Sequence, residues 1–180
     1  MTAAEQDYLL GLDISTFCCG FCIWNLSANK FETAGHIPLN KYKNWLDKVD
    51  QVCYIIEEIK DNTNSIKHVV IEDIITKFIS GKSNIKTIIK LAGFNHVIQR
   101  KCYEIFGLEP SLLNVIRARN LAECKVPRGS NYKEYVLKRI VELHPEVKTL
   151  LPLMKTKAEF AKEAFDVADA IVVARAGAAE

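Results

Sequence analysis

Four carboxylates stand in stretches of this chain that are otherwise largely apolar. Asp13 lies in "YLLGLDIS", Glu72 in "KHVVIEDI", and Asp166 and Asp169 in "AFDVADAIVVARA". Burying a carboxylate costs several kcal/mol unless the group is paired or bound to a cation, and neighbouring carboxylates repel one another. A hard divalent cation with oxygen ligands removes both penalties. The four acids therefore predict a site for Mg²⁺, in which Mn²⁺ can substitute.

A site of this kind suits one class of reaction. Two divalent ions about 4 Å apart can clamp a phosphodiester, one activating water and the other stabilising the leaving oxygen. Each acid also has a simpler interpretation: Asp13 can cap the turn that follows it, Glu72 can end its strand in solvent, and Asp166 can be a charge favoured at a helix N-terminus. Asp169 lies deeper in its apolar segment, where a solvated role is harder to assign.

The pattern of apolar residues predicts the elements that must bring these acids together. Strands are predicted at 8–15, 20–26, 30–38, 67–74 and 111–116, and helices at 42–59, 83–106, 131–143 and 157–178. Three short strands in succession predict an antiparallel meander, and the alternation that follows predicts parallel strands. The expected fold class is α/β, a five-stranded mixed sheet with helices on both faces. Without a linker or an internal repeat, residues 1–180 are predicted to form a single domain.

The net charge of +2 hides an uneven distribution. Residues 1–76 hold 6 basic and 11 acidic residues, residues 77–157 hold 16 basic and 6 acidic, and residues 158–180 hold 2 basic and 5 acidic. The basic middle block predicts a surface that binds a polyanion beside an acidic centre. The alternative is a set of solvated helix faces.

Three segments together resemble a known family. These are "LGLDIST" with the following "GFCIWN", then "VVIEDI", and then "AFDVADAIVVA". They are similar to the RuvC-like Holliday junction resolvases of the ribonuclease H-like superfamily, and the likeness extends over most of the chain. The resemblance implies a ribonuclease H-like fold and a homodimeric, Mg²⁺-dependent endonuclease with two ions per site. Such an enzyme cuts four-way DNA junctions by paired, symmetric nicks in recombination, repair or replication.

The resemblance also assigns roles to residues. The family's strand and helix acids correspond to Asp13, Glu72, Asp166 and Asp169, and its basic catalytic residue to Lys133. An aromatic side chain that packs against opened bases corresponds to Phe78. The DNA-binding residues predicted in this way, or from the basic block and the "GKS" cluster, are Phe78, Lys82, Ser83, Arg117, Arg119, Lys125, Arg128 and Lys133. The segment "NLAECKVPRGSNY" departs from the compact bacterial pattern and is predicted to be a mobile basic loop.

A homodimer suits a four-way junction, because the junction offers two equivalent strands to cut. The helix predicted at 83–106 has more apolar positions than one core-facing stripe needs: Ile85, Ile88, Ile89, Ala92 and Val97. Some of these side chains can face a second subunit, although a fully buried helix would look the same.

The cysteines offer competing chemistry. Cys18, Cys19 and Cys22 form a cluster with a C-x-x-C spacing, whereas the other three cysteines stand alone. Zinc needs four ligands, and a redox C-x-x-C begins a helix, so the cluster is predicted to pack as small side chains. With "MTAAEQDY" at the start and no export signal, the thiols predict a reducing, cytoplasmic setting. A viral, phage or organellar origin stays open, and no membrane or nucleotide cofactor is expected.

Other functions share these features. A nuclease for RNA–DNA hybrids or other branched DNA would use the same acids, because they bind the phosphodiester and not the junction. A non-catalytic junction-binding module is a third alternative. "GLDIST" is also similar to the first phosphate loop of actin-like ATPases, but that fold needs a second similar half.

Overall fold

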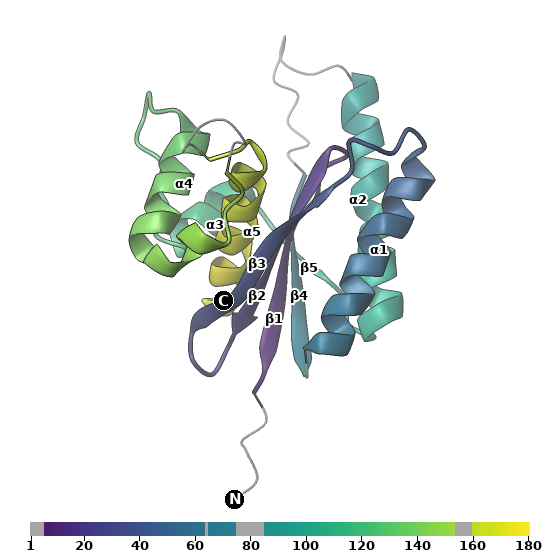
Figure 1. The fold of residues 1–180 in the computed structure, drawn as a ribbon, viewed down its shortest axis with the longest axis horizontal. Coiled ribbons are helices and arrows are strands. Elements are labelled where there is room, and N and C mark those ends of the chain that lie inside the picture. Colours follow the sequence, from purple (N-terminus) through teal and green to yellow (C-terminus); the bar gives the residue numbers. More distant parts are fainter. Residues whose placement is uncertain (1–5, 64, 75–84, 154–159) are drawn as a thin grey trace, which may run out of the picture.

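The computed structural model describes residues 6–63, 65–74, 85–153 and 160–180 of the chain. A five-stranded sheet with the order β3-β2-β1-β4-β5 forms its centre (Figure 1). The strands are β1 Tyr8–Asp13, β2 Cys18–Asn25, β3 Lys30–Pro38, β4 Ile66–Glu72 and β5 Ser111–Leu113. The first three strands pair antiparallel, and β4 pairs parallel with both β1 and β5. The predicted mixed sheet is confirmed.

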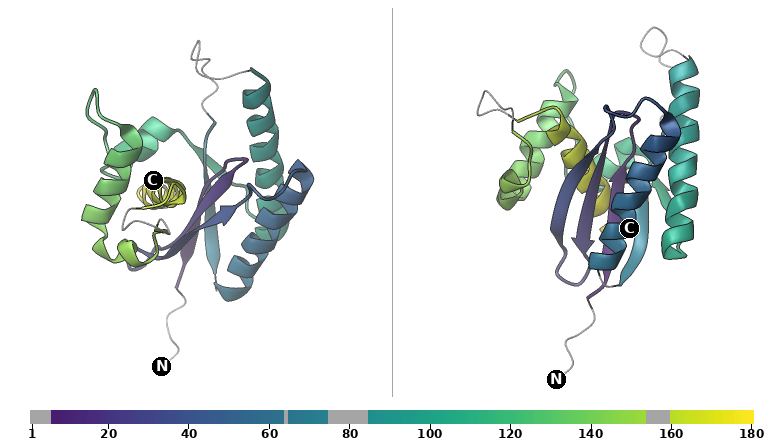
Figure 2. Two further views of the ribbon diagram at one scale, coloured as in Figure 1. Left: turned by 45° about the horizontal axis from the view of Figure 1, so that its top comes forward. Right: turned by 45° about the vertical axis from the view of Figure 1, so that its right-hand side comes forward.

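Helices cover both faces of this sheet, as predicted (Figure 2). They are α1 Trp45–Asn62, α2 Ile85–Phe106, α3 Val115–Leu121, α4 Tyr132–Leu143 and α5 Glu163–Ala178, with a short 3₁₀ helix, η1, at Pro145–Thr149. The α1–α2 pair packs on one face. On the other face α5 lies directly against the strands, and α3 and α4 pack on its outer side. Two apolar cores result, one on each side of the sheet.

Helix α5 is buried on almost every side, because its residues after the second turn are nearly all Ala, Val and Ile. A helix that is apolar all round belongs in a protein interior. Its backbone also comes unusually close to the sheet: a Cβ built on Gly20 would stand 2.0 Å from the carbonyl oxygen of Asp166. One built on Gly11 would stand 2.6 Å from the Cβ of Ala174. Glycine at these two strand positions therefore sets the height of α5 above the sheet.

The predicted strand at 111–116 is half wrong. Strand β5 ends at Leu113, and Asn114 begins helix α3, which the sequence analysis missed. The Asn114 Oδ1 accepts hydrogen bonds from the backbone N–H of Ile116 at 2.9 Å and of Arg117 at 3.4 Å. An asparagine cap of this kind ends the extended chain and starts a helix. Apolar residues on both sides of the cap conceal the change from strand to helix.

The last helix begins later than predicted, at Glu163 and not at 157. Leu153 and Phe160 form an antiparallel bridge, and the Ala161 N–H donates to the Pro152 carbonyl oxygen at 2.8 Å. These contacts hold the chain extended just before α5. The remaining predicted elements are present, with described boundaries within three residues of those expected.

The predicted mobile basic loop is packed at its beginning. Ala122 and Cys124 are fully buried. The Glu123 carboxylate between them pairs with Arg175 of α5 at 2.9 Å, and the Glu123 carbonyl oxygen accepts from Arg139 of α4 at 3.2 Å. Only the part that follows Cys124 is largely exposed. Among the residues described, no helix has the length and apolar character needed to cross a membrane.

Replacing Gly20 with alanine tests how tightly α5 is held. The new methyl group would overlap backbone atoms of Asp166, so Gly20→Ala is expected to lower the free energy of unfolding by roughly 2–3 kcal/mol. Gly93→Ala is the matched control. Nothing lies within 4 Å of a Cβ at this helical position, and alanine should raise stability by about 0.5–1 kcal/mol. Urea unfolding measures both; equal effects would contradict the close approach of α5.

Candidate active site

The two strand acids lie side by side at one edge of the sheet. Asp13 is the last residue of β1, and Glu72 is the last residue of β4. These strands run parallel, and Leu12 pairs with Ile71 in their register. Since parallel neighbours end at the same edge, Asp13 and Glu72 are adjacent there. This is the edge drawn at the top of the sheet in Figure 1.

The two helix acids reach the same edge from above. Asp166 and Asp169 lie in the first two turns of α5, and their spacing places them on one helix face. The Asp166 backbone lies against Gly20, and Gly20 pairs with Asp13 across β1 and β2. The structure therefore brings together all four carboxylates predicted from the sequence. We refer to them as the carboxylate cluster.

Burial and mutual repulsion raise the pKa values in this cluster. Burial is the largest cause for Asp13, and the charges of Glu72, Asp169 and Asp166 raise its pKa further. The pKa of Glu72 rises to about 7, through burial and then the charge of Asp169. Burial raises the pKa of Asp169 to about 6. The cluster thus holds more negative charge than a partly buried site accommodates near neutral pH, which favours a cation.

Two basic side chains oppose this charge. The Arg119 guanidinium lies 3.9 Å from the Asp169 carboxylate, and both side chains are largely buried, at 18% and 13% exposed. Lys133, at the start of α4, lowers the pKa of every member of the carboxylate cluster. Its Nζ lies 5.8 Å from the centre of the Phe165 ring. The placement of Lys133 beside the acids agrees with the sequence prediction, and its catalytic role stays a prediction.

The Arg119 side chain is largely buried and packs against an aromatic ring, unlike a surface arginine that only contacts DNA. Its guanidinium lies 4.9 Å from the centre of the Tyr132 ring. Its Nε is buried without a hydrogen-bond partner among the described residues. A buried, unpaired donor is costly, so this nitrogen is available to a group that enters the site.

The other predicted DNA contacts are scattered. Arg117 pairs with Glu180 at 2.8 Å, beyond the C-terminal end of α5 and away from the carboxylate cluster. Lys125 and Arg128 are exposed in the loop before α4. Phe78, Lys82 and Ser83 lie outside the described residues.

Two further neighbours of the carboxylate cluster, Cys18 and His36, were not predicted from the sequence. Burial raises the pKa of Asp166, and the nearby Cys18 thiol opposes that rise. His36 of β3 pairs with Gly20, and its charge also lowers the pKa of Asp166. Only the strand register shows this proximity: Asp13, Gly20 and His36 stand in one row across three strands.

The remaining cysteines pack as predicted. Cys19 and Cys22 lie on opposite faces of β2, one in each apolar core. All six cysteines are free, and burial raises the pKa of the Cys19 and Cys22 thiols. The C-x-x-C spacing therefore provides neither a dithiol nor a pair of ligands.

The carboxylate cluster has the donor chemistry of a Mg²⁺ site, since all its predicted ligands are oxygens. Over the described ranges 6–63, 65–74, 85–153 and 160–180, no three His, Cys, Asp or Glu side chains are arranged closely enough to hold a metal ion. Like charges keep the carboxylates apart, and Arg119 occupies one side of Asp169. Metal binding would require these side chains to move inward around a cation.

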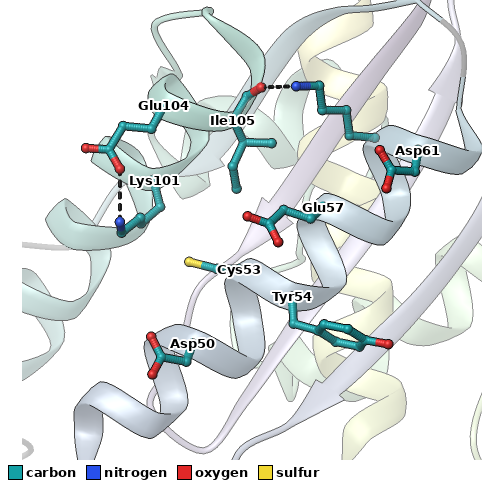
Figure 3. A pocket seen from close by; sticks show the side chains of 9 residues that line it. Asp50, Cys53, Tyr54, Glu57, Asp61, Lys101, Glu104 and Ile105 are labelled. Atoms are coloured by element: carbon teal, nitrogen blue, oxygen red, sulfur yellow. Dashed lines mark hydrogen bonds and ion pairs between the residues drawn. The ribbon is translucent and has the colours of Figure 1, made fainter.

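A groove of about 660 Å³ lies elsewhere, between α1 and α2 (Figure 3). Four carboxylates line it, from Asp50, Glu57, Asp61 and Glu104, with only two lysines. The groove is on the sheet face opposite α5, so it takes no part in the carboxylate cluster. Its acidic lining makes it unsuited to a nucleic acid backbone.

Comparison with known proteins identifies the fold. No protein-family model and no curated protein matches the sequence. Among solved structures, T. thermophilus RuvC in complex with a Holliday junction substrate aligns with a TM-score of 0.64 at 11% identity, covering 96% of this chain and 93% of that one. The yeast mitochondrial Holliday junction resolvase aligns with a TM-score of 0.57 at 14% identity, covering 96% and 78%. The chain therefore has the ribonuclease H-like fold of the RuvC-like resolvases, as the resemblance implied.

The raised pKa of Glu72 predicts how stability depends on pH. In the folded chain without metal its pKa is about 7, against an ordinary value of 4.5. The folded state thus holds a proton more tightly, and stability is lost as pH rises from about 4.5 to about 7. Glu72→Gln should be more stable than wild type by roughly 1–3 kcal/mol at pH 8 and equal to it at pH 4.

Chemical unfolding in chelator at several pH values measures this difference. Glu57→Gln, the same change at an exposed position on α1, should follow wild type throughout. A Glu72→Gln curve parallel to wild type across the whole pH range would contradict the repulsion within the carboxylate cluster.

Proposed function

We propose that this chain is a divalent-metal-dependent endonuclease that cuts four-way DNA junctions. The observation that carries the proposal is the convergence of four carboxylates, from β1, β4 and α5, at one sheet edge with raised pKa values. Carboxyl groups with pKa values perturbed by burial and by one another cluster at functional sites. The fold supports the substrate class, because a RuvC with this fold was solved with a Holliday junction substrate.

In this proposal the carboxylate cluster holds Mg²⁺, two ions per site, with Mn²⁺ as a substitute. When bound, the ions supply an activated water and stabilise the leaving oxygen of the phosphodiester. The chain's own residues provide the rest. Lys133 opposes the rise in the pKa values of all four acids and so favours their ionised forms, and Arg119 does the same for Glu72 and Asp169. The buried Arg119 Nε is available to hydrogen bond a phosphate oxygen.

The DNA arms would lie across the basic loop before α4. Lys125 and Arg128 are exposed there, and Lys133 follows them on α4 toward the carboxylate cluster. Lysine and arginine contacts to phosphates give affinity that falls with salt and does not read sequence. Arg117 is not part of this surface, because Glu180 pairs with it at the other end of α5.

Two copies of the chain would act together on one junction. Ile85 and Ile89 of α2 are 60% and 63% exposed, and Trp45 and Leu46 of α1 are also largely exposed. Both helices begin at the same end of the molecule (Figure 1). This apolar surface is suited to a second copy, and a two-fold dimer matches the two equivalent strands of a four-way junction.

Cleavage of labelled substrates tests the function. Wild type with Mg²⁺ should introduce paired, symmetric nicks into a four-way junction and leave linear duplex and an RNA–DNA hybrid intact. Asp13→Asn should reduce the rate by roughly 10³-fold or more, because it removes a carboxylate that would hold the metal ions on which hydrolysis depends. Chelator should abolish cutting by wild type.

A thermal-shift measurement separates metal binding from cleavage. Millimolar Mg²⁺ should raise the Tm of wild type, since a ligand that binds the folded state stabilises it, and should not raise that of Asp13→Asn. If only the RNA–DNA hybrid is cut, the proposed metal site is supported and the proposed junction substrate is wrong. Junction binding with neither cutting nor a Mg²⁺ shift would contradict the nuclease and leave a DNA-binding module.

Arg119 and Arg117 form a matched pair for a second test. Arg119→Gln removes a charge that lowers the pKa values of Glu72 and Asp169, so their ionisation should move to higher pH. The pH–rate profile should shift in the alkaline direction, with a loss of roughly 10–100-fold at neutral pH. Arg117→Gln should cut like wild type. Equal losses in the two variants, with unchanged profiles, would show that both arginines act only through overall charge.

A further inference from the structure

Phe17 is an exposed aromatic residue in the loop between β1 and β2. Its side chain is 70% exposed, more than any other large apolar side chain among the described residues. It follows Asp13 by four residues, so its Cα lies within about 14 Å of that of the acid. A single exposed apolar side chain is common on protein surfaces. Phe17 differs from such residues in two respects: its backbone is fixed by hydrogen bonds, and a lysine lies beside its ring.

The backbone on both sides of the ring is fixed. The Phe17 N–H donates to the Ser15 hydroxyl at 3.3 Å, and its carbonyl oxygen accepts from the Leu39 N–H at 2.8 Å. Lys48 of α1 donates to the carbonyl oxygen of Thr16 at 2.6 Å. The loop is thereby tied to α1 and to the end of β3, and the ring is presented to solvent from a fixed base.

The same lysine lies beside the ring. The Lys48 Nζ is 5.4 Å from the centre of the Phe17 ring, and within the described part of the chain it forms no ion pair with a carboxylate. The loop therefore offers an open aromatic face four residues along the chain from Asp13, and Lys48 of α1 places an uncompensated positive charge beside that face. Aromatic faces that stack on bases and cations that follow the backbone are the two components of single-strand recognition.

We propose that Phe17 and Lys48 form a platform for one unpaired nucleotide beside the cleaved phosphodiester. The Phe17 ring stacks on the base, and Lys48 binds a neighbouring phosphate. The base must be unpaired, because the faces of bases within a duplex are covered by their neighbours. This platform rests on the proposed nuclease function for its location, and it adds a contact to an opened base within a few nucleotides of the cut.

A second copy of the chain is the competing occupant of this surface, because Trp45 and Leu46 are exposed nearby on α1. Two observations favour DNA. Lysine is depleted from the centres of protein interfaces, and Lys48 lies beside the ring. The loop also continues directly from Asp13, where DNA must come close in any nuclease that uses this carboxylate.

A binding cycle in chelator tests the platform without any cleavage. Four-way junctions carry an abasic residue at each nucleotide flanking the point of strand exchange in turn. For wild type, one such position should weaken binding roughly 10-fold, the loss expected for one stacked base. Phe17→Ala should weaken binding of the intact junction by the same factor and show no further loss with that abasic residue. Phe17→Trp should restore the dependence on the base.

One control and one further test accompany the cycle. Tyr54→Ala removes an exposed ring from α1 on the face that carries the acidic groove and should bind like wild type. Lys48→Gln should reduce the slope of affinity against salt by about one phosphate contact.

The outcomes are distinct. Coupling between Phe17 and one base supports the platform even if wild type cuts nothing, in which case the nuclease proposal fails alone. Additive losses, with wild type cutting normally, overturn the platform and leave the nuclease. A change from dimer to monomer in Phe17→Ala, measured by sedimentation and without base coupling, assigns the ring to a protein interface and also overturns it.

Discussion

Close contact between α5 and the sheet is the constraint on which the carboxylate cluster depends. The helix acids reach the strand acids only because Gly20 has no side chain where the Asp166 backbone passes. The same contact at Gly11 holds the middle of the helix at the same height. Ordinary packing of a helix on a sheet would place α5 further out, and Asp166 with it. The chain thus uses missing side chains on two strands to position charged side chains on a helix.

Charge balance is the second consequence of this packing. Four acids meet where burial and repulsion oppose their ionisation. Lys133 counters this effect at all four acids, and Arg119 counters it at Glu72 and Asp169. Two cations do not balance four carboxylates, so the arrangement keeps an affinity for further positive charge. The acidic groove between α1 and α2 does not contribute to this lack of positive charge, because it lies on the other face of the sheet.

Much of this site could be predicted from the sequence, because its acids stand within apolar segments, and a charged residue in an apolar segment is recognisable without a structure. Asp13, Glu72 and Asp169 were predicted in this way and lie together. Residues that lie near the carboxylate cluster only because of strand register or helix phase have no such pattern in the sequence. His36 reaches the cluster only through the pairing of three strands, and Arg119 only because Asn114 starts a short helix where a strand was expected.

The position of α5 in the chain has a consequence for synthesis. Every other described element precedes it, and the sheet face that it covers includes Leu9 and Val70, far earlier in the sequence. While the ribosome is still making the later residues, that apolar face lacks its cover, and contacts between such distant segments form slowly. A nascent chain would therefore expose an aggregation-prone apolar surface. Its carboxylate cluster would also be incomplete at that stage. Folding and acquisition of the acidic centre would then finish together, in one late docking step.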